Sequence, residues 1–120
     1  MLKERIRTYC QNGENCSRII LQAAAEEYDI SLSQDMLTSC SGISGGFGIG
    51  NLCGGMIAAV MVLSLLFDEE TVKEKRILFF FLVQEKSGVL DCMRLSSDDC
   101  TELLEMIGEV MQEVIEMRVP

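Results

Sequence analysis

The chain has 120 residues, of which 48% are hydrophobic and 24% charged, and this size is typical of one domain over residues 1–120. Ten Lys and Arg against 19 Asp and Glu give a net charge of −9, which argues against nucleic acid as a partner because its phosphates would be repelled. Six cysteines without a histidine exclude a His-dependent catalytic triad and a His-ligated haem.

Apolar periodicity and capping residues predict an all-α fold, a compact bundle of five to six helices in which a glycine-rich loop precedes a buried apolar helix. Asn15 and Ser33 are expected N-caps, and Gly88 is an expected C-cap. The expected helices cover about residues 2–10, 15–28, 33–40, 52–67, 69–86 and 97–117, with the glycine loop at 42–50.

The apolar helix expected over 52–67 contains no charged residue, which raises the question of a membrane span. Its 16 residues would extend about 24 Å, less than the ~30 Å hydrocarbon layer. We therefore expect a buried core helix and no membrane association. No apolar segment follows the charged residues at positions 3–7, unlike in a secretory signal, so we expect a cytoplasmic protein whose thiols are kept reduced.

The last expected helix is capped by Ser97 and is amphipathic. Its apolar seam consists of Leu103, Ile107, Val110, Val114 and Met117. This seam packs either within the chain or across a homodimer, and both arrangements remain open. Acidic residues form a second stripe, which we interpret as a solvated face because no Ca²⁺-loop pattern accompanies it. The stripe consists of Glu102, Glu105, Glu109, Glu113 and Glu116.

The six cysteines form no Cys-x-x-Cys motif, so a shared site must be assembled from separate helices. They are Cys10, Cys16, Cys40, Cys53, Cys92 and Cys100. Cys16, Cys53 and Cys100 fall in predicted first helical turns, where backbone N–H groups and the helix dipole stabilise a thiolate. Such thiols suit metal ligation or redox exchange. The alternative is that each cysteine is a small buried hydrophobic residue.

The segment SGISGGFGIGNLCGG contains seven glycines, which permit left-handed backbone and close approach to a bound group. It lacks the Gly-Lys-Ser/Thr of a phosphate loop and the preceding strand of a dinucleotide site. We expect Gly46, Gly48, Gly50 and Gly54 to direct backbone donors at the sulfur of a cofactor or thiolate. A tight turn between two helices is the alternative.

These features together resemble the C_GCAxxG_C_C family of redox-active proteins. The matching residues are Gly13-Glu14-Asn15-Cys16-Ser17, the Gly-Gly-Phe-Gly loop, Cys53-Gly54-Gly55, Cys92 and Cys100. The resemblance implies a small all-helical protein of the kind found in anaerobic bacteria, with a redox role for those four cysteines, whereas Cys10 and Cys40 are additions. The pattern is more distantly similar to the helical domain of split-Soret cytochromes, where an iron-sulfur centre accompanies haem. Because this chain has no haem motif, only the sulfur chemistry would transfer.

The leading hypothesis is an electron-transfer protein whose Cys16, Cys53, Cys92 and Cys100 ligate an iron-sulfur cluster and serve a redox partner protein. The first alternative is a thiol–disulfide protein in which two of the four cycle, with Cys53 among them. Zinc held by the four thiolates is a further alternative. A structural or partner-docking helical protein without redox chemistry also remains open, as does the question of enzymatic activity.

Overall fold

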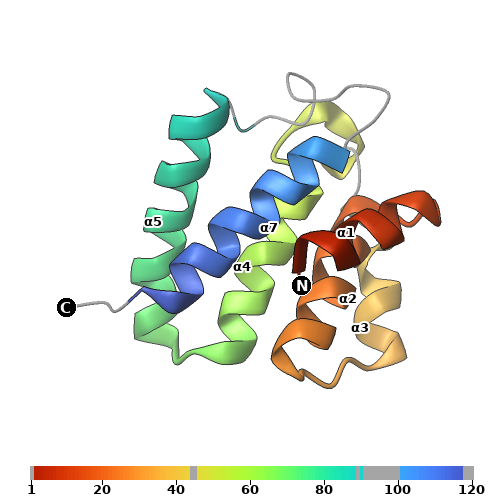
Figure 1. Cartoon of the computed structure of the whole chain (residues 1–120), viewed down its shortest axis with the longest axis horizontal. Helices are drawn as coiled ribbons and strands as arrows, with labels where there is room; N and C mark the ends of the chain where they lie inside the picture. Colours follow the sequence, from red (N-terminus) through yellow and green to blue (C-terminus); the bar gives the residue numbers. More distant parts are fainter. Residues whose placement is uncertain (1, 44–45, 89, 91–100, 118–120) are drawn as a thin grey trace.

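The computed structural model describes residues 2–43, 46–88, 90 and 101–117 of the chain. These residues form six α-helices and no strand, which confirms the predicted all-α fold (Figure 1). The helices are α1 (Leu2–Gln11), α2 (Cys16–Tyr28), α3 (Gln34–Ser39), α4 (Gly54–Leu66), α5 (Glu69–Ser87) and α7 (Thr101–Glu116). A short 3-10 turn, η1 (Cys40–Gly42), leads into the expected glycine loop, and the coiled segment η2 (Gly46–Gly50) within it contains left-handed residues.

Local capping explains where several helices begin and end. The side chain of Asn15 accepts a hydrogen bond from the Arg18 N–H (3.0 Å), and that of Ser33 accepts one from the Met36 N–H (3.1 Å). Gly88 ends α5 in the left-handed conformation with φ 80°. These three caps are confirmed, whereas the expected cap Ser97 lies outside the described residues.

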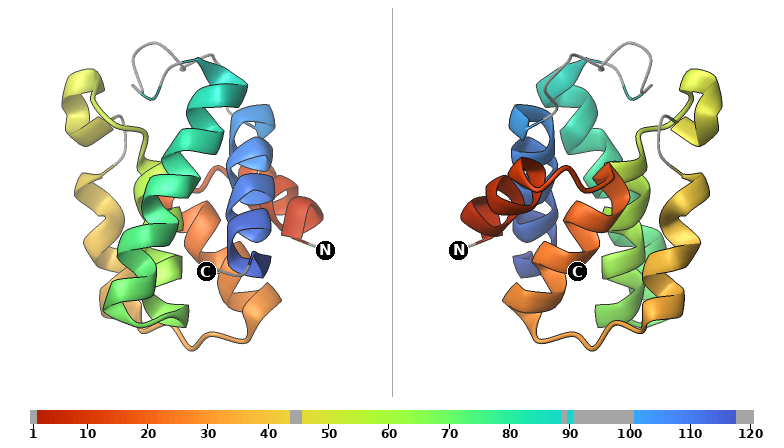
Figure 2. Two further views of the ribbon diagram at one scale, coloured as in Figure 1. Left: turned by 90° about the vertical axis from the view of Figure 1, so that its left-hand side faces the viewer. Right: turned by 90° about the vertical axis from the view of Figure 1, so that its right-hand side faces the viewer.

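Helix α4 lies at the centre of the bundle and packs against α2, α5 and α7 (Figures 1 and 2). Its sequence is apolar on nearly all sides, so its neighbours bury most of it, and only Ser64 and Leu65 are exposed. The helix begins at Gly54 and not at Leu52, because Cys53 is extended and its N–H donates to the Leu90 carbonyl (3.3 Å). Among the described residues, no helix is both long and apolar enough to cross a membrane.

Helix α7 packs inside the chain, against α1, α4 and α5 (Figure 1). Its buried residues are Leu104, Ile107, Gly108, Val110, Met111 and Val114. Of the expected seam, Ile107, Val110 and Val114 are buried, whereas Leu103 and Met117 are half-buried and Leu103 lies at the edge of the core. Leu103 and Leu104 lie about 100° apart on a helix, and it is Leu104 that faces α4. A Cβ atom on Gly55 would lie 2.7 Å from the Leu104 Cδ2.

The acidic stripe of α7 is exposed except at Glu105. Its exposed members among the described residues are Glu102, Glu109, Glu113 and Glu116. The Glu105 side chain is only 11% exposed and forms ion pairs with Arg7 (2.8 Å) and Lys3 (3.9 Å). The expectation of a wholly solvated stripe is thus wrong at this position, because α1 crosses α7 there and its cations cover the carboxylate.

A buried lysine joins α5 to the end of α7. The Lys75 Nζ donates to the carbonyl oxygens of Val114 and Met117, both at 2.7 Å, and lies 4.7 Å from the centre of the Phe67 ring. Carbonyls at the end of a helix have no partner within the helix and carry its negative dipole, so an ammonium group satisfies both needs. Lys75 therefore acts as a side-chain cap supplied by another helix.

We expect Lys75→Met to lower the free energy of unfolding by about 2 kcal/mol, because two buried carbonyls lose a charged donor while the apolar stem is kept. Urea denaturation followed by circular dichroism measures the change. The matched control is Lys86→Met at an exposed lysine of the same helix, with an expected loss of at most about 0.5 kcal/mol. Equal losses in the two variants would contradict the capping role.

Candidate functional site

The structure brings together Cys16 and Cys53, two of the four predicted site cysteines. Cys16 is the first residue of α2, and Cys53 is the N-cap residue of α4. Because α2 packs along α4, the N-terminal ends of the two helices meet and the two thiol groups share a hydrogen bond. No disulfide joins the cysteines in the described part of the chain.

The two thiols differ in protonation. The hydrogen bond donated by the Cys53 thiol lowers the pKa of Cys16 to about 6, although burial acts in the opposite direction. Backbone N–H groups of Gly55 and Ser17 add to this stabilisation of the Cys16 thiolate. The neighbouring Cys16 sulfur and burial raise the pKa of Cys53 well above its usual range. At neutral pH the site therefore holds one thiolate and one thiol.

The N-terminus of α2 is braced by side chains close to Cys16. The Ser17 hydroxyl is buried and donates to the Asn15 Oδ1 (2.8 Å), which fixes the cap residue. The same hydroxyl lies 3.4 Å from the Cys40 carbonyl oxygen, and Arg18 Nε donates to the Leu37 carbonyl (2.9 Å). These contacts hold α3 and η1 against the end of α2 that carries the thiolate.

Gly54 leaves space for the Cys16 sulfur. A Cβ atom on Gly54 would lie 3.1 Å from the Cys16 Sγ and 3.2 Å from the Ile43 Cγ2. The absence of a side chain at position 54 thus lets the thiol sit against the first turn of α4, beneath Ile43. Ile43 was not predicted from the sequence, since nothing in its local pattern indicates that it lies beside Gly54. Gly55 was recognised only as part of the family pattern, and not for its N–H, which serves both thiols.

The remaining predicted glycines shape the connection to Cys53. Gly46 has φ 62°, and a Cβ atom there would lie 2.3 Å from backbone atoms of Asn51, so only glycine fits. The Gly46 carbonyl accepts from the Asn51 N–H (3.1 Å), which closes the turn. Gly48 and Gly50 also have positive φ. A cofactor-binding role for Gly46, Gly48, Gly50 and Gly54 stays a prediction.

Of the four other cysteines, Cys40 is placed apart from this pair by its own contacts. Cys40 is buried, and its sulfur lies 3.5 Å from the Met36 carbonyl oxygen. Cys92 and Cys100 lie outside the described residues. Within residues 2–43, 46–88, 90 and 101–117, no group of three or more Cys, Asp or Glu side chains could hold a metal ion.

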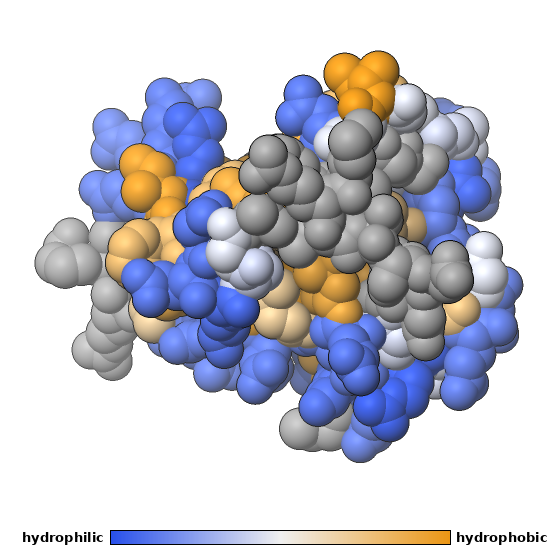
Figure 3. Space-filling model, turned by 90° about the horizontal axis from the view of Figure 1, so that it is seen from above, coloured by the Kyte–Doolittle hydropathy of each residue, from blue (hydrophilic) through white to orange (hydrophobic). Residues whose placement is uncertain are grey.

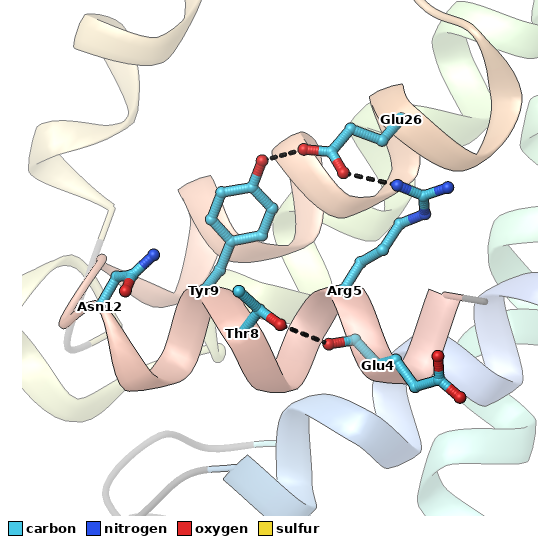
Figure 4. Close-up of a pocket in the computed structure, with 6 residues that line it drawn as sticks. All are labelled: Glu4, Arg5, Thr8, Tyr9, Asn12 and Glu26. Carbon is cyan, nitrogen blue, oxygen red and sulfur yellow. Dashed lines mark hydrogen bonds and ion pairs between the residues drawn. The ribbon is translucent and has the colours of Figure 1, made fainter.

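A polar pocket of about 490 Å³ lies between α1 and α2 and contains none of the predicted site residues (Figure 4). Arg5 forms an ion pair with Glu26 (2.7 Å), the Tyr9 hydroxyl donates to the same carboxylate, and the Thr8 hydroxyl donates to the Glu4 carbonyl (3.0 Å). Glu26 raises the pKa of Tyr9 and is itself kept ionised, its pKa lowered by Tyr9 and Arg5. The contacts of Arg5 and Tyr9 with Glu26 brace α1 against α2, so the pocket is a weaker candidate than the thiol pair.

A family model described as "Putative redox-active protein (C_GCAxxG_C_C)" matches residues 14–116. The matched range contains Cys16 and Cys53, and also Cys92 and Cys100, which lie outside the described residues. No curated protein and no solved structure matches the chain.

We expect Gly54→Ala to raise the pKa of Cys16 by about 1, because the added methyl group pushes the sulfur away from its donors. The pH dependence of iodoacetamide alkylation, followed at Cys16 by mass spectrometry, measures this pKa. Gly42→Ala is the matched control, since a Cβ atom at position 42 meets nothing within 4 Å and Gly42 has no positive φ. An unchanged alkylation profile for Gly54→Ala would contradict the role of Gly54 in placing the thiol.

Proposed function

The chain belongs to the C_GCAxxG_C_C family of putative redox-active proteins, and on this premise we propose that it is a thiol–disulfide redox protein. Cys16 and Cys53 cycle between the dithiol and the disulfide. The observation that carries the proposal is the hydrogen-bonded thiolate and thiol at the meeting point of two helix N-termini. Such a pair needs no metal and no histidine to react.

Cys16 is the attacking residue. Its lowered pKa, about 6, favours the thiolate at neutral pH. The Cys16 side chain is also only half-buried, whereas Cys53 is 3% exposed. The Cys16 thiolate attacks one sulfur of a disulfide in a partner molecule. A bond forms between Cys16 and that sulfur, and the other partner sulfur leaves as a thiolate.

Cys53 completes the exchange. Once the Cys16 sulfur is bonded and no longer negative, the main cause of the raised Cys53 pKa is gone, and the Cys53 proton passes to the departing thiolate. The Cys53 sulfur then attacks Cys16 and displaces the second partner sulfur as a thiolate. The two cysteines lose two electrons, and the partner disulfide becomes one thiol and one thiolate.

The proposal includes a cytoplasmic setting and a protein partner. A reducing compartment returns the pair to the dithiol form after each cycle. The low exposure of Cys53 restricts direct contact with the partner to Cys16.

We expect graded glutathione redox buffers to convert Cys16 and Cys53 reversibly into one disulfide, because the two thiols are close enough to shift each other's pKa. Differential alkylation and peptide mass spectrometry identify the linked residues. Cys16→Ser and Cys53→Ser should each abolish the linkage, whereas Cys40→Ser, at a buried cysteine outside the pair, should leave it intact. Failure of Cys16 and Cys53 to link at any potential tested would refute the proposal.

The second candidate is an iron-sulfur protein, favoured by a family match that includes all four predicted cysteines. Cys16 and Cys53 fit this function as two adjacent thiolate ligands beneath backbone N–H groups, and Cys92 and Cys100 would supply the other two. The Cys53 N–H bonds to Leu90, two residues before Cys92 in the sequence. A bound cluster would supply one-electron transfer. Four-thiolate zinc would use the same ligands.

Anaerobic reconstitution separates the two candidates. An iron-sulfur site should bind iron and sulfide, give a brown protein, and lose both when Cys92 and Cys100 are replaced by serine. The thiol–disulfide function should survive that double replacement, with the Cys16–Cys53 linkage unchanged. A colourless wild-type product without iron and sulfide would reject the cluster, and zinc in the same analysis would favour the zinc site.

A further inference from the structure

A groove of about 290 Å³ lies at the surface between α4 and α5, which pack side by side in both views of Figure 2. Most of its wall consists of half-buried apolar side chains, which the facing sides of the two helices supply at spacings of three and four residues. The apolar lining consists of Leu52, Ile57, Val60, Met61 and Phe80, and the polar lining of Ser64 and Arg76. A hollow with apolar walls and few polar groups is typical of a site for a small amphipathic molecule.

The groove joins a second hollow of about 340 Å³ at Ser64 and Arg76, because these two residues line both. The other residues of the second hollow are Phe67, Glu69, Val72 and Lys73. Figure 3 likewise shows hydrophobic side chains among hydrophilic ones on its left-hand side, the side on which Figure 1 places α5. The two hollows together, which we call the α4–α5 groove, are therefore apolar toward Leu52 and charged toward the connection between the two helices.

Arg76 carries the charge at the junction of the two hollows. Among the residues that the structure describes, all ion pairs use cations of α1, and the Arg76 guanidinium is paired with no carboxylate. The Ser64 hydroxyl donates to the Val60 carbonyl (3.0 Å), so its single proton is already used. Arg76 is therefore the donor that both hollows offer to a ligand.

Two cations and one carboxylate line the α4–α5 groove, so its net charge is positive. Residues four apart are neighbours on a helix, so Glu69 offsets the charge of Lys73 and leaves that of Arg76. The carboxylates of Glu70 and Glu74 are rotated about α5 by about 120° and 160° from Arg76, and they line neither hollow. In a chain with a net charge of −9, this positive end favours an anionic head group, which a guanidinium binds through two parallel hydrogen bonds.

The length of the apolar part suits an alkyl chain. Ile57 and Ser64, which lie at its two ends on α4, are separated by about 10 Å along the helix. With C–C bonds of about 1.5 Å, an extended chain of about eight carbons spans this distance. A molecule with such a tail and one negative charge would match both the apolar wall and Arg76.

We propose that the α4–α5 groove binds a medium-chain fatty-acid carboxylate. The alkyl chain lies along α4, against Val60, Met61 and Phe80, and the Arg76 guanidinium donates two hydrogen bonds to the carboxylate. None of the residues that line the groove is a cysteine, so this site is independent of the proposed redox function.

The test titrates the reduced wild-type chain with sodium octanoate and follows the NMR shifts of its backbone amides. We expect saturable shifts concentrated at residues 57–64 and 73–80. Arg76→Gln should weaken octanoate binding about tenfold, because a charge-assisted, two-bond contact is lost. The matched control is Lys86→Gln, at an exposed lysine of the same helix that lines neither hollow, and it should leave the affinity unchanged.

Two further ligands separate the contributions of the charge and the alkyl chain. The neutral alcohol 1-octanol should bind about tenfold more weakly than octanoate, and Arg76→Gln should not change its affinity. Hexanoate should also bind about tenfold more weakly than octanoate, because each buried methylene group is worth up to about fourfold in affinity. Met61→Glu should abolish octanoate binding, since it places a carboxylate in the apolar wall. Circular dichroism verifies that each variant is folded.

An octanoate affinity that is the same in the wild type and in folded Arg76→Gln would overturn the proposal. So would equal affinities for hexanoate and octanoate, or amide shifts spread over the whole surface. A second copy of the chain in the groove would give a dimer in sedimentation velocity and no shifts with octanoate, and this result would equally overturn the proposal.

Discussion

The packing of α2 against α4 is the contact on which the rest of the molecule depends. Helix α4 is apolar on nearly all sides and is mostly enclosed, and α2 covers it over much of its length. This arrangement brings together two helix N-termini, whose positive dipole ends repel each other unless a negative charge lies between them. The Cys16 thiolate is that charge. The same contact therefore completes the core and favours the ionised form of the reactive sulfur.

In the thiol pair, the more exposed thiol is ionised and the more buried one keeps its proton. The sulfur that carries the negative charge belongs to the half-buried Cys16, and the sulfur that keeps its proton belongs to the buried Cys53. Ile43 lies beside Gly54, and Gly54 provides the space that the Cys16 sulfur occupies. The fold thus assigns different roles to two chemically identical side chains through their surroundings alone.

Features set by neighbouring residues could be predicted from the sequence, and features set by packing could not. The caps at Asn15, Ser33 and Gly88 depend on a few local hydrogen bonds and were predicted correctly. The centre of the buried face of α7 lies closer to Leu104 and Met111 than the expected seam placed it, because two adjacent apolar rows on that helix fit the same periodicity. Each thiol at a helix start could be recognised alone. Which two would meet depends on how α2 docks onto α4, and no spacing in the chain encodes that directly.

Phe47 combines a costly backbone conformation with an exposed ring in the segment that leads to Cys53. Its backbone is left-handed, with φ 64°, a conformation that costs a residue with a side chain about 1 kcal/mol relative to glycine, and its ring is 55% exposed. A glycine at this position would relax the turn but remove the ring from the surface. The segment leading to Cys53 therefore carries its backbone cost and its exposed aromatic ring at one and the same residue.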